Sequence, residues 1–172
     1  MKGKHVILGL LNTRGGLTGY QIKEIVQTQL HHFYDGGFGM IYPTLKKLEE
    51  AEMVSKETIS QDDKPNKNVF YITDLGKMEF NQAVNQKTEP EVLKSDFLMK
   101  LYFGASLDSG NDVTFLKEEL VRKQASLQQL VENVEKWRND GMSDHQLFTV
   151  EYGMAYYRAA IEVIEKRLAE IS

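Results

Sequence analysis

The chain has 172 residues, of which 41% are hydrophobic, enough for a folded core in one domain with an appendage or in two small domains. It has no cysteine and no apolar run near the ~20 residues that cross a bilayer, which excludes disulfides and thiolate metal sites and leads us to expect a cytoplasmic protein without a membrane partner. The net charge of −4 comes entirely from residues 86–172, because residues 1–85 hold ten basic and ten acidic side chains, so any surface that binds nucleic acid must be a local patch.

The start of the chain is typical of two short helices. The apolar run 6–11 is followed by Gly15, and glycine commonly terminates a helix. Thr18 and Gln21 have the spacing of a capping box, so we expect a second helix to begin near Gly19.

A third helix is expected from about Met40 to Ala51. Pro43 fits in its first turn, where the missing N–H of proline would have no helical partner. Three apolar residues recur at helical spacing and should face inward: Ile41, Leu45 and Leu48. The opposite face should therefore be exposed.

The sequence pattern then changes to that of strands. Residues 54–60 and 68–72 are predicted to form a hairpin around the polar tip 61–67, and Thr73 should cap a further helix. Three helices, a hairpin and a helix in this order indicate a winged helix-turn-helix, which we assign to residues 1–86.

Residues 87–172 are predicted to be entirely helical. A capping-box pattern at Thr88 and Glu91 should begin one helix, and a long helix should follow from 113 to 137. Ser143 should cap the last helix, whose apolar residues alternate at three and four positions, as in helices that pack at a shallow angle: Leu147, Val150, Met154, Tyr157, Ile161, Ile164, Leu168 and Ile171. The fold class is thus mainly α, with β structure only in the wing hairpin.

The third helix and the wing hold the candidate DNA contacts. In a winged helix-turn-helix, the third helix enters the major groove and the hairpin tip contacts the backbone or the minor groove. The candidates on the exposed face of the helix are Tyr42, Pro43, Thr44, Lys46 and Lys47, and those at the tip are Lys64, Asn66 and Lys67. Taken alone, each pattern also fits an ordinary amphipathic helix and a hydrophilic turn.

Three segments make the interpretation more specific. Residues 39–49 read GMIYPTLKKLE, which resembles the recognition-helix signature of the PadR family of bacterial regulators. Residues 7–11 followed by 19–20, and residues 70–73 followed by 76–77, agree with the same family in order and spacing.

The resemblance covers residues 5–85 closely and extends more loosely, through residues 96–103, to the family's longer C-terminal domain. It implies a homodimeric repressor on a palindromic operator of double-stranded DNA, with Tyr20 among the DNA contacts. Members that resemble this longer type often lose DNA on binding a small aromatic acid or a similar effector.

We assign residues 87–172 to dimerisation and effector binding. The main dimer contact is expected along the last helix, through Leu147, Met154, Tyr157, Ile161, Ile164 and Leu168. The alternative is that this row of apolar residues, the seam of the last helix, packs within one chain and that the dimer forms through other surfaces. Four aromatic residues are candidates for an effector pocket, although aromatics at this spacing more commonly form core: Phe97, Tyr102, Phe103 and Tyr152.

Other chemistry has little support. Adjacent His31 and His32 would point about 100° apart on a helix and would not easily share a metal ion. Residues 36–39 lack the lysine–hydroxyl pair of a phosphate-binding loop. We expect no cofactor, no metal and no enzymatic activity. Two alternatives stay open: a helical adaptor whose winged domain binds protein, and a repressor without an effector.

Overall fold

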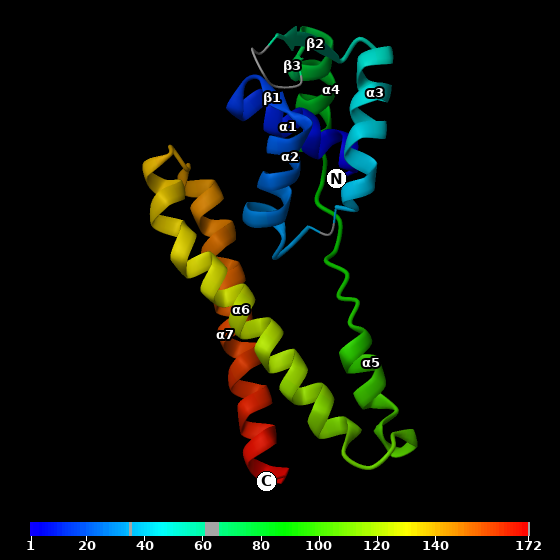
Figure 1. Ribbon diagram of the computed structural model, residues 1–172, viewed down its shortest axis with the longest axis vertical. Helices are drawn as coiled ribbons and strands as arrows, with labels where there is room; N and C mark the ends of the chain where they lie inside the picture. Colours follow the sequence, from blue (N-terminus) through cyan, green and yellow to red (C-terminus); the bar gives the residue numbers. More distant parts are fainter. Residues whose placement is uncertain (35, 61–65, 172) are drawn as a thin grey trace. The chain divides into compact units, whose positions relative to one another are not determined.

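The computed structural model describes residues 1–34, 36–60 and 66–171, and the chain forms two compact units, Met1–Glu89 and Pro90–Ser172 (Figure 1). The first unit contains α1 (Gly3–Arg14), β1 (Leu17–Thr18), α2 (Gly19–Ile25), a π-helical turn η1 (Val26–Leu30), a 3-10 turn η2 (Phe38–Met40), α3 (Ile41–Glu50), β2 (Val54–Ile59), β3 (Lys67–Ile72) and α4 (Asp74–Val84). The second contains α5 (Asp96–Tyr102), a 3-10 turn η3 (Gly104–Ser106), α6 (Asn111–Asn139) and α7 (Asp144–Ile171).

The described strands form one antiparallel sheet in the order β1-β3-β2. Val54 pairs with Ile72 at the base of the wing, which confirms the predicted hairpin, and Leu17 of β1 pairs with Phe70. β1 was not predicted, because two residues are too few to show the alternation of a strand.

The core of the first unit lies between α1, α2, α3 and the sheet. Its buried side chains are Ile7, Leu8, Leu11, Leu17, Ile22, Ile41, Leu45, Leu48, Val54 and Phe70. They include the whole inward stripe predicted for α3. Since each buried leucine or isoleucine contributes about 1.5–3 kcal/mol, this stripe fixes which face of α3 is turned outward.

The helix caps follow the sequence at three of the four predicted places. The Thr18 hydroxyl accepts the backbone N–H of Gln21, 3.2 Å away, in a complete capping box, and the Thr73 hydroxyl accepts that of Gly76 at 3.1 Å. Ser143 caps α7 in the same way.

The helix predicted to begin at Thr88 and Glu91 exists as α5, but its predicted start is wrong. Residues 87–95 are not helical, and α5 begins at Asp96, where the Ser95 hydroxyl accepts the backbone N–H of Leu98 at 3.1 Å. A first turn is costly to nucleate without packing, and Val92 next to this capping pattern is exposed.

In the second unit, α6 and α7 run antiparallel and lie closest together near the turn that joins them (Figure 1). The centre of their contact is formed by Leu130 and Trp137 of α6 and by Val150 and Tyr157 of α7. Burial raises the pKa of the Tyr157 phenol above its ordinary value, so this side chain stays neutral in the core. No helix among the described residues is both long and apolar enough to cross a membrane.

A shared carboxylate ties α1 to α4 in the first unit. Glu79 Oε1 accepts from Lys4 Nζ at 2.7 Å and from His5 Nε2 at 3.0 Å. These donors, chiefly Lys4, lower the pKa of Glu79 below its ordinary value.

Glu79→Gln should remove a pH-dependent part of the stability of this unit. A carboxylate whose pKa is lower in the folded chain stabilises the fold above its unfolded pKa, and this contribution is lost as the pH falls through the folded pKa. We therefore expect the free energy of unfolding, measured with urea between about pH 3 and 7, to fall more steeply on acidification in the wild type than in the variant. Equal slopes would contradict this role of Glu79.

Candidate nucleic-acid interface

Two exposed tyrosines stand at the junction of α2, α3 and the wing. Tyr20 is 70% exposed and Tyr42 is 60% exposed. The ring of Tyr42 lies against Gly19, where an added Cβ would come within 2.6 Å of the ring. Only glycine leaves room for the tyrosine ring in this position.

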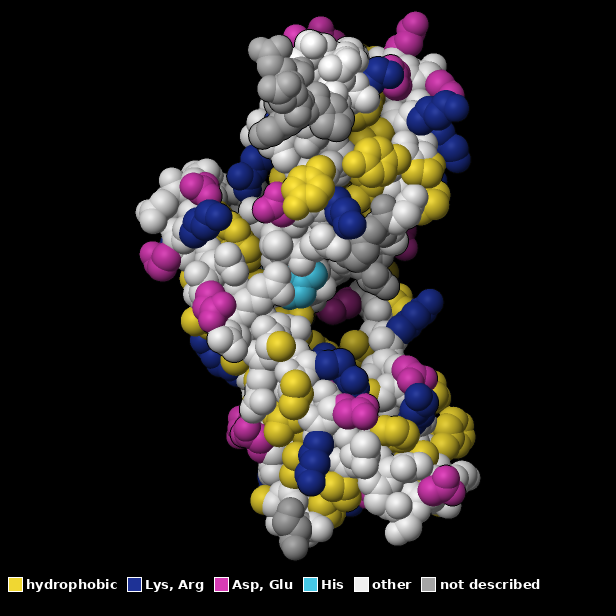
Figure 2. All heavy atoms as spheres, in the orientation of Figure 1, with side chains coloured by type: hydrophobic (Ala, Val, Ile, Leu, Met, Phe, Trp, Pro, Cys, Tyr) yellow, Lys and Arg dark blue, Asp and Glu magenta, His cyan; other side chains and the backbone are white. Residues whose placement is uncertain are grey.

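These tyrosines line one groove, of about 460 Å³, together with the tip end of β3 in the wing. Asn66 and Lys67 form the wing side of the groove, so the structure brings together four of the predicted DNA contacts. On the visible face of this unit in Figure 2, yellow side chains, a colour that includes tyrosine, lie beside dark-blue Lys and Arg side chains. Lys64 lies outside the described residues.

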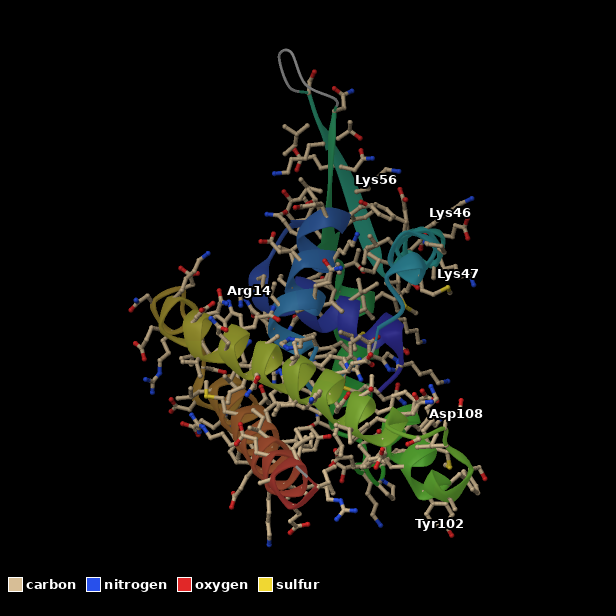
Figure 3. The ribbon with its side chains drawn as sticks, turned by 60° about the horizontal axis from the view of Figure 1, so that its bottom comes forward. Arg14, Lys46, Lys47, Lys56, Tyr102 and Asp108 are labelled. Carbon is tan, nitrogen blue, oxygen red and sulfur yellow. The ribbon has the colours of Figure 1, made fainter. Side chains whose placement is uncertain are left out.

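The remaining candidates lie along α3 and do not share one face. Pro43 is exposed in the first turn, and the side chain of Lys46 is 78% exposed. Lys46 and Lys47 leave α3 in different directions (Figure 3), as consecutive helical residues must. Thr44 and Lys47 line a separate pocket, against α1.

Lys56 is a cation beside α3 that the sequence analysis did not name. Its Nζ lies 2.9 Å from Glu49 Oε1 and so joins β2 to α3. Lys46 lies 3.8 Å from Glu50. Both acidic residues, which would otherwise repel phosphates, are therefore partly neutralised. Finding Lys56 from sequence requires the position of β2 relative to α3, which no local pattern gives.

Tyr71 on β3 stays neutral. A hydrogen bond with Glu57 of β2 raises the pKa of the Tyr71 phenol above its ordinary value, and burial adds to the effect. The charge of this part of the wing therefore depends on Glu57 and the lysines.

The four aromatic candidates for an effector pocket are divided among three places in the helical unit. Phe97 lines a pocket of about 460 Å³ with residues of α6 and α7. Tyr102 and Phe103 are exposed, with ring centroids 5.1 Å apart. The hydroxyl of Tyr152 donates to Glu91 at 3.3 Å.

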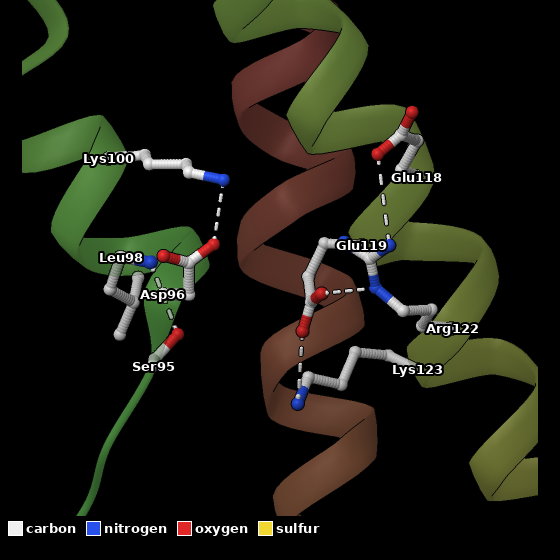
Figure 4. A network of polar contacts seen from close by, with 8 residues as sticks. All are labelled: Ser95, Asp96, Leu98, Lys100, Glu118, Glu119, Arg122 and Lys123. Atoms are coloured by element: carbon white, nitrogen blue, oxygen red, sulfur yellow. Dashed lines mark hydrogen bonds and ion pairs between the residues drawn. The ribbon is translucent and has the colours of Figure 1, made fainter.

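The pocket at Phe97 has charged walls, drawn in Figure 4. Glu119 accepts from Arg122 at 2.7 Å and from Lys123 at 3.2 Å, and Asp96 accepts from Lys100 at 2.8 Å (Figure 4). Three of the four cations that line it, Lys100, Arg122 and Lys123, are thus paired with carboxylates, and no described carboxylate pairs with Lys94.

The seam predicted for the dimer contact is partly used within the chain. Tyr157 and Ile164 are buried, and Met154 packs against the α6–α7 core. The other three predicted residues are half-buried: Leu147, Ile161 and Leu168. Exposed apolar side chains remain on α7, among them Phe148 and Val163.

Three helices, a small antiparallel sheet with a wing and long C-terminal helices define a winged-helix regulator. Residues 7–82 match the transcriptional regulator PadR-like family, and residues 93–172 match the family described as virulence activator alpha C-term. The negative transcriptional regulator PadR of Bacillus subtilis (strain 168) is 34% identical over 134 residues, which are 77% of this chain and 73% of that protein. The chain belongs to the PadR-like family of transcriptional regulators.

Solved structures agree with this assignment. The smu.1604c protein of Streptococcus mutans UA159 is 43% identical, with a TM-score of 0.91 over 98% of this chain and 99% of that chain. The PadR-like transcriptional regulator BC1756 of Bacillus cereus is 42% identical, with a TM-score of 0.90 over 100% and 97%. The structure of Bacillus subtilis PadR in complex with operator DNA is 29% identical, with a TM-score of 0.80 over 98% of each chain. The structure of the same protein in complex with p-coumaric acid is 28% identical, with a TM-score of 0.71 over 98% of this chain and 97% of that chain.

Proposed function

We propose that the protein is a transcriptional repressor that binds a palindromic operator as a homodimer and releases it on binding a small aromatic acid. The observation that carries the proposal is the groove between α2, α3 and the wing, where Tyr20, Tyr42 and Lys67 gather. Tyrosine hydroxyls can donate to bases or phosphates, and ammonium groups attract phosphates. The relative named as a negative regulator, and its structures with operator DNA and p-coumaric acid, support repression and both partners.

In this proposal the first unit reads DNA and the second forms the dimer. Two copies of α3 related by a twofold axis would read successive major grooves if they lay about 34 Å apart. We assign Tyr157 and Ile164 to holding α6 against α7, and the exposed apolar residues of α7 to the partner chain. Sedimentation equilibrium should give twice the 19.7 kDa chain mass at micromolar concentration, and a monomer would contradict the dimer.

Lys46→Gln should weaken binding to operator and random DNA by the same factor. An exposed lysine without base contacts acts through phosphates, so its loss should flatten the dependence of log affinity on log salt by about one unit. Fluorescence anisotropy on both duplexes at several salt concentrations measures this. The exposed Lys87 lies outside the described groove, and Lys87→Gln, with the same charge change, should leave both affinities unchanged. A loss confined to the operator would contradict the phosphate role.

Gly19→Ala should lower operator affinity roughly fivefold to tenfold, about the effect of one lost base contact, with little change on random DNA. The new methyl group would displace the Tyr42 ring, which can rotate away, so the fold should survive. Tyr42→Ala in the Gly19→Ala background should then add little, because both changes remove the same contact. Additive losses in this double-mutant cycle would show that Gly19 does not act through Tyr42.

The effector part of the proposal has its own experiment. Titrating p-coumarate into the protein–operator complex should release DNA, with benzoate as a simpler aromatic acid for comparison. Release follows if the effector binds the DNA-free dimer more tightly than the DNA-bound one. No release by any phenolic acid would favour a repressor without an effector, and DNA binding without salt dependence would favour the adaptor.

A further inference from the structure

A second pocket of about 640 Å³ lies within the winged-helix unit, on the side of α3 that faces α1. Small-molecule sites commonly have volumes of about 300–1,000 Å³ and mainly apolar walls. The apolar walls here come from α1, η1, η2 and α3: Val6, Ile7, Val26, Met40, Ile41 and Leu48. No lining residue is shared with the groove that holds Tyr20 and Tyr42.

Lysines supply the charge of this pocket. Lys2, Lys4 and Lys47 line it, and no acidic side chain does so among the residues that the structure describes. Glu79 neutralises Lys4 at 2.7 Å. Within the described ranges, no carboxylate forms an ion pair with Lys2 or Lys47. Among the described residues, the pocket therefore combines apolar walls with two ammonium groups that no carboxylate pairs with.

We infer that this pocket binds a small amphipathic anion, with a flat apolar body against Val26 and Ile41 and an acidic group near Lys47 and Lys2. Apolar walls favour the body of such a ligand, and the unpaired ammonium groups favour its charge over a neutral molecule. The site differs from the pocket at Phe97, where three carboxylates line the wall and pair with three of the four cations.

Lys47 connects this site to DNA binding, a step that rests on the proposed function. Met40, Thr44, Lys47 and Ala51 all lie on one side of α3 and line the pocket. A ligand anion paired with Lys47 withdraws that ammonium group from phosphates, so ligand and DNA oppose each other's binding by the same factor.

Methionine labelling gives a direct test of the site. Met40 and Met53 line the pocket, whereas Met142 and Met154 belong to the α6–α7 core. The full chain with [¹³C-methyl]methionine would be titrated with 8-anilinonaphthalene-1-sulfonate, with signals assigned by Met→Leu variants. We expect saturable shifts at Met40 and Met53. Shifts confined to the other methionines, or no saturable shift, would overturn the proposal.

Variants and a neutral analogue test the charge. Lys47→Gln should weaken binding of the sulfonate roughly threefold to tenfold, whereas the matched Lys87→Gln should not change it. Ala51→Trp, at the pocket wall, should reduce binding by filling space. N-phenyl-1-naphthylamine has the same rings without the sulfonate and should bind more weakly. Equal binding of both compounds would overturn the assignment to anions.

Anisotropy with DNA then separates the two proposals. Saturating sulfonate should lower the DNA affinity of the wild type and have no such effect on Lys47→Gln. Unchanged wild-type affinity while the Met40 and Met53 shifts are complete would overturn the coupling through Lys47. Absence of DNA binding without any ligand would instead contradict the proposed function, and the methionine titration would still decide the site.

Discussion

Gly76→Ala should destabilise the winged-helix unit by about 2–3 kcal/mol, although alanine is normally favoured over glycine inside a helix. Gly76 is buried in the first turn of α4. An added Cβ would overlap the carbonyl oxygen of Met53 and lie 2.8 Å from Ile72 Cγ1. That oxygen already accepts the backbone N–H of Thr73 at 3.1 Å, and a backbone atom cannot rotate away as a side chain can. The whole first turn of α4 must therefore move.

Urea denaturation followed by circular dichroism measures this loss. Gly39→Ala is the matched control in the same unit, because a Cβ at Gly39 would meet no atom within 4 Å. The control should change the free energy of unfolding by less than about 0.5 kcal/mol. Equal effects of the two substitutions would contradict the close approach of α4 to Met53.

Trp137→Ala should destabilise the helical unit by about 3–5 kcal/mol, the range for removing a large buried aromatic side chain. Trp137 is 5% exposed in the cluster with Leu130, Val150 and Tyr157. Its removal would leave a cavity between two long helices that have few other buried residues in this region. Because this unit is proposed to form the dimer, the dimer of the variant should also have a higher dissociation constant than that of the wild type.

Thermal unfolding followed at 222 nm tests the prediction at a fixed protein concentration. Phe103→Ala removes an aromatic ring that is 59% exposed, and it should have a small effect. Equal losses for Trp137→Ala and Phe103→Ala would show that the α6–α7 core does not determine the stability of this unit.

Features set by neighbouring residues could be predicted from the sequence. The inward stripe of α3 and the caps at Thr18, Thr73 and Ser143 depend on residues within one or two turns of each other. The start of α5 could not be predicted, because the capping pattern at Thr88 and Glu91 is local while a helix also needs packing to support its first turn. The same holds for β1, which exists only by pairing with β3.

Sequence reasoning named most residues of the candidate site, but it did not predict how they are arranged in space. Helical geometry places Lys46 and Lys47 about 100° apart, but only the packing of α1 shows that Lys47 lines a pocket while Lys46 faces solvent. Lys56 was missed because its pairing with Glu49 crosses from β2 to α3. The role of these residues in DNA binding stays a prediction.

The seam of α7 shows a further limit of periodicity. An alternation at three and four positions indicates that a helix packs on another, but it does not identify the partner. In this chain Tyr157 packs in the α6–α7 core and Ile164 is buried, whereas the partner of the remaining seam residues stays a prediction.

The central claim, that this winged helix binds operator DNA specifically, is tested most directly by fluorescence anisotropy. The labelled duplex would carry the promoter upstream of the protein's own and neighbouring genes, with random-sequence competitor and two salt concentrations. We expect saturable binding at about 10 nM or tighter at physiological salt, resistant to competitor and weakened as salt rises. No binding by micromolar, folded protein at low salt, with co-purified ligands excluded by mass spectrometry, would contradict the claim.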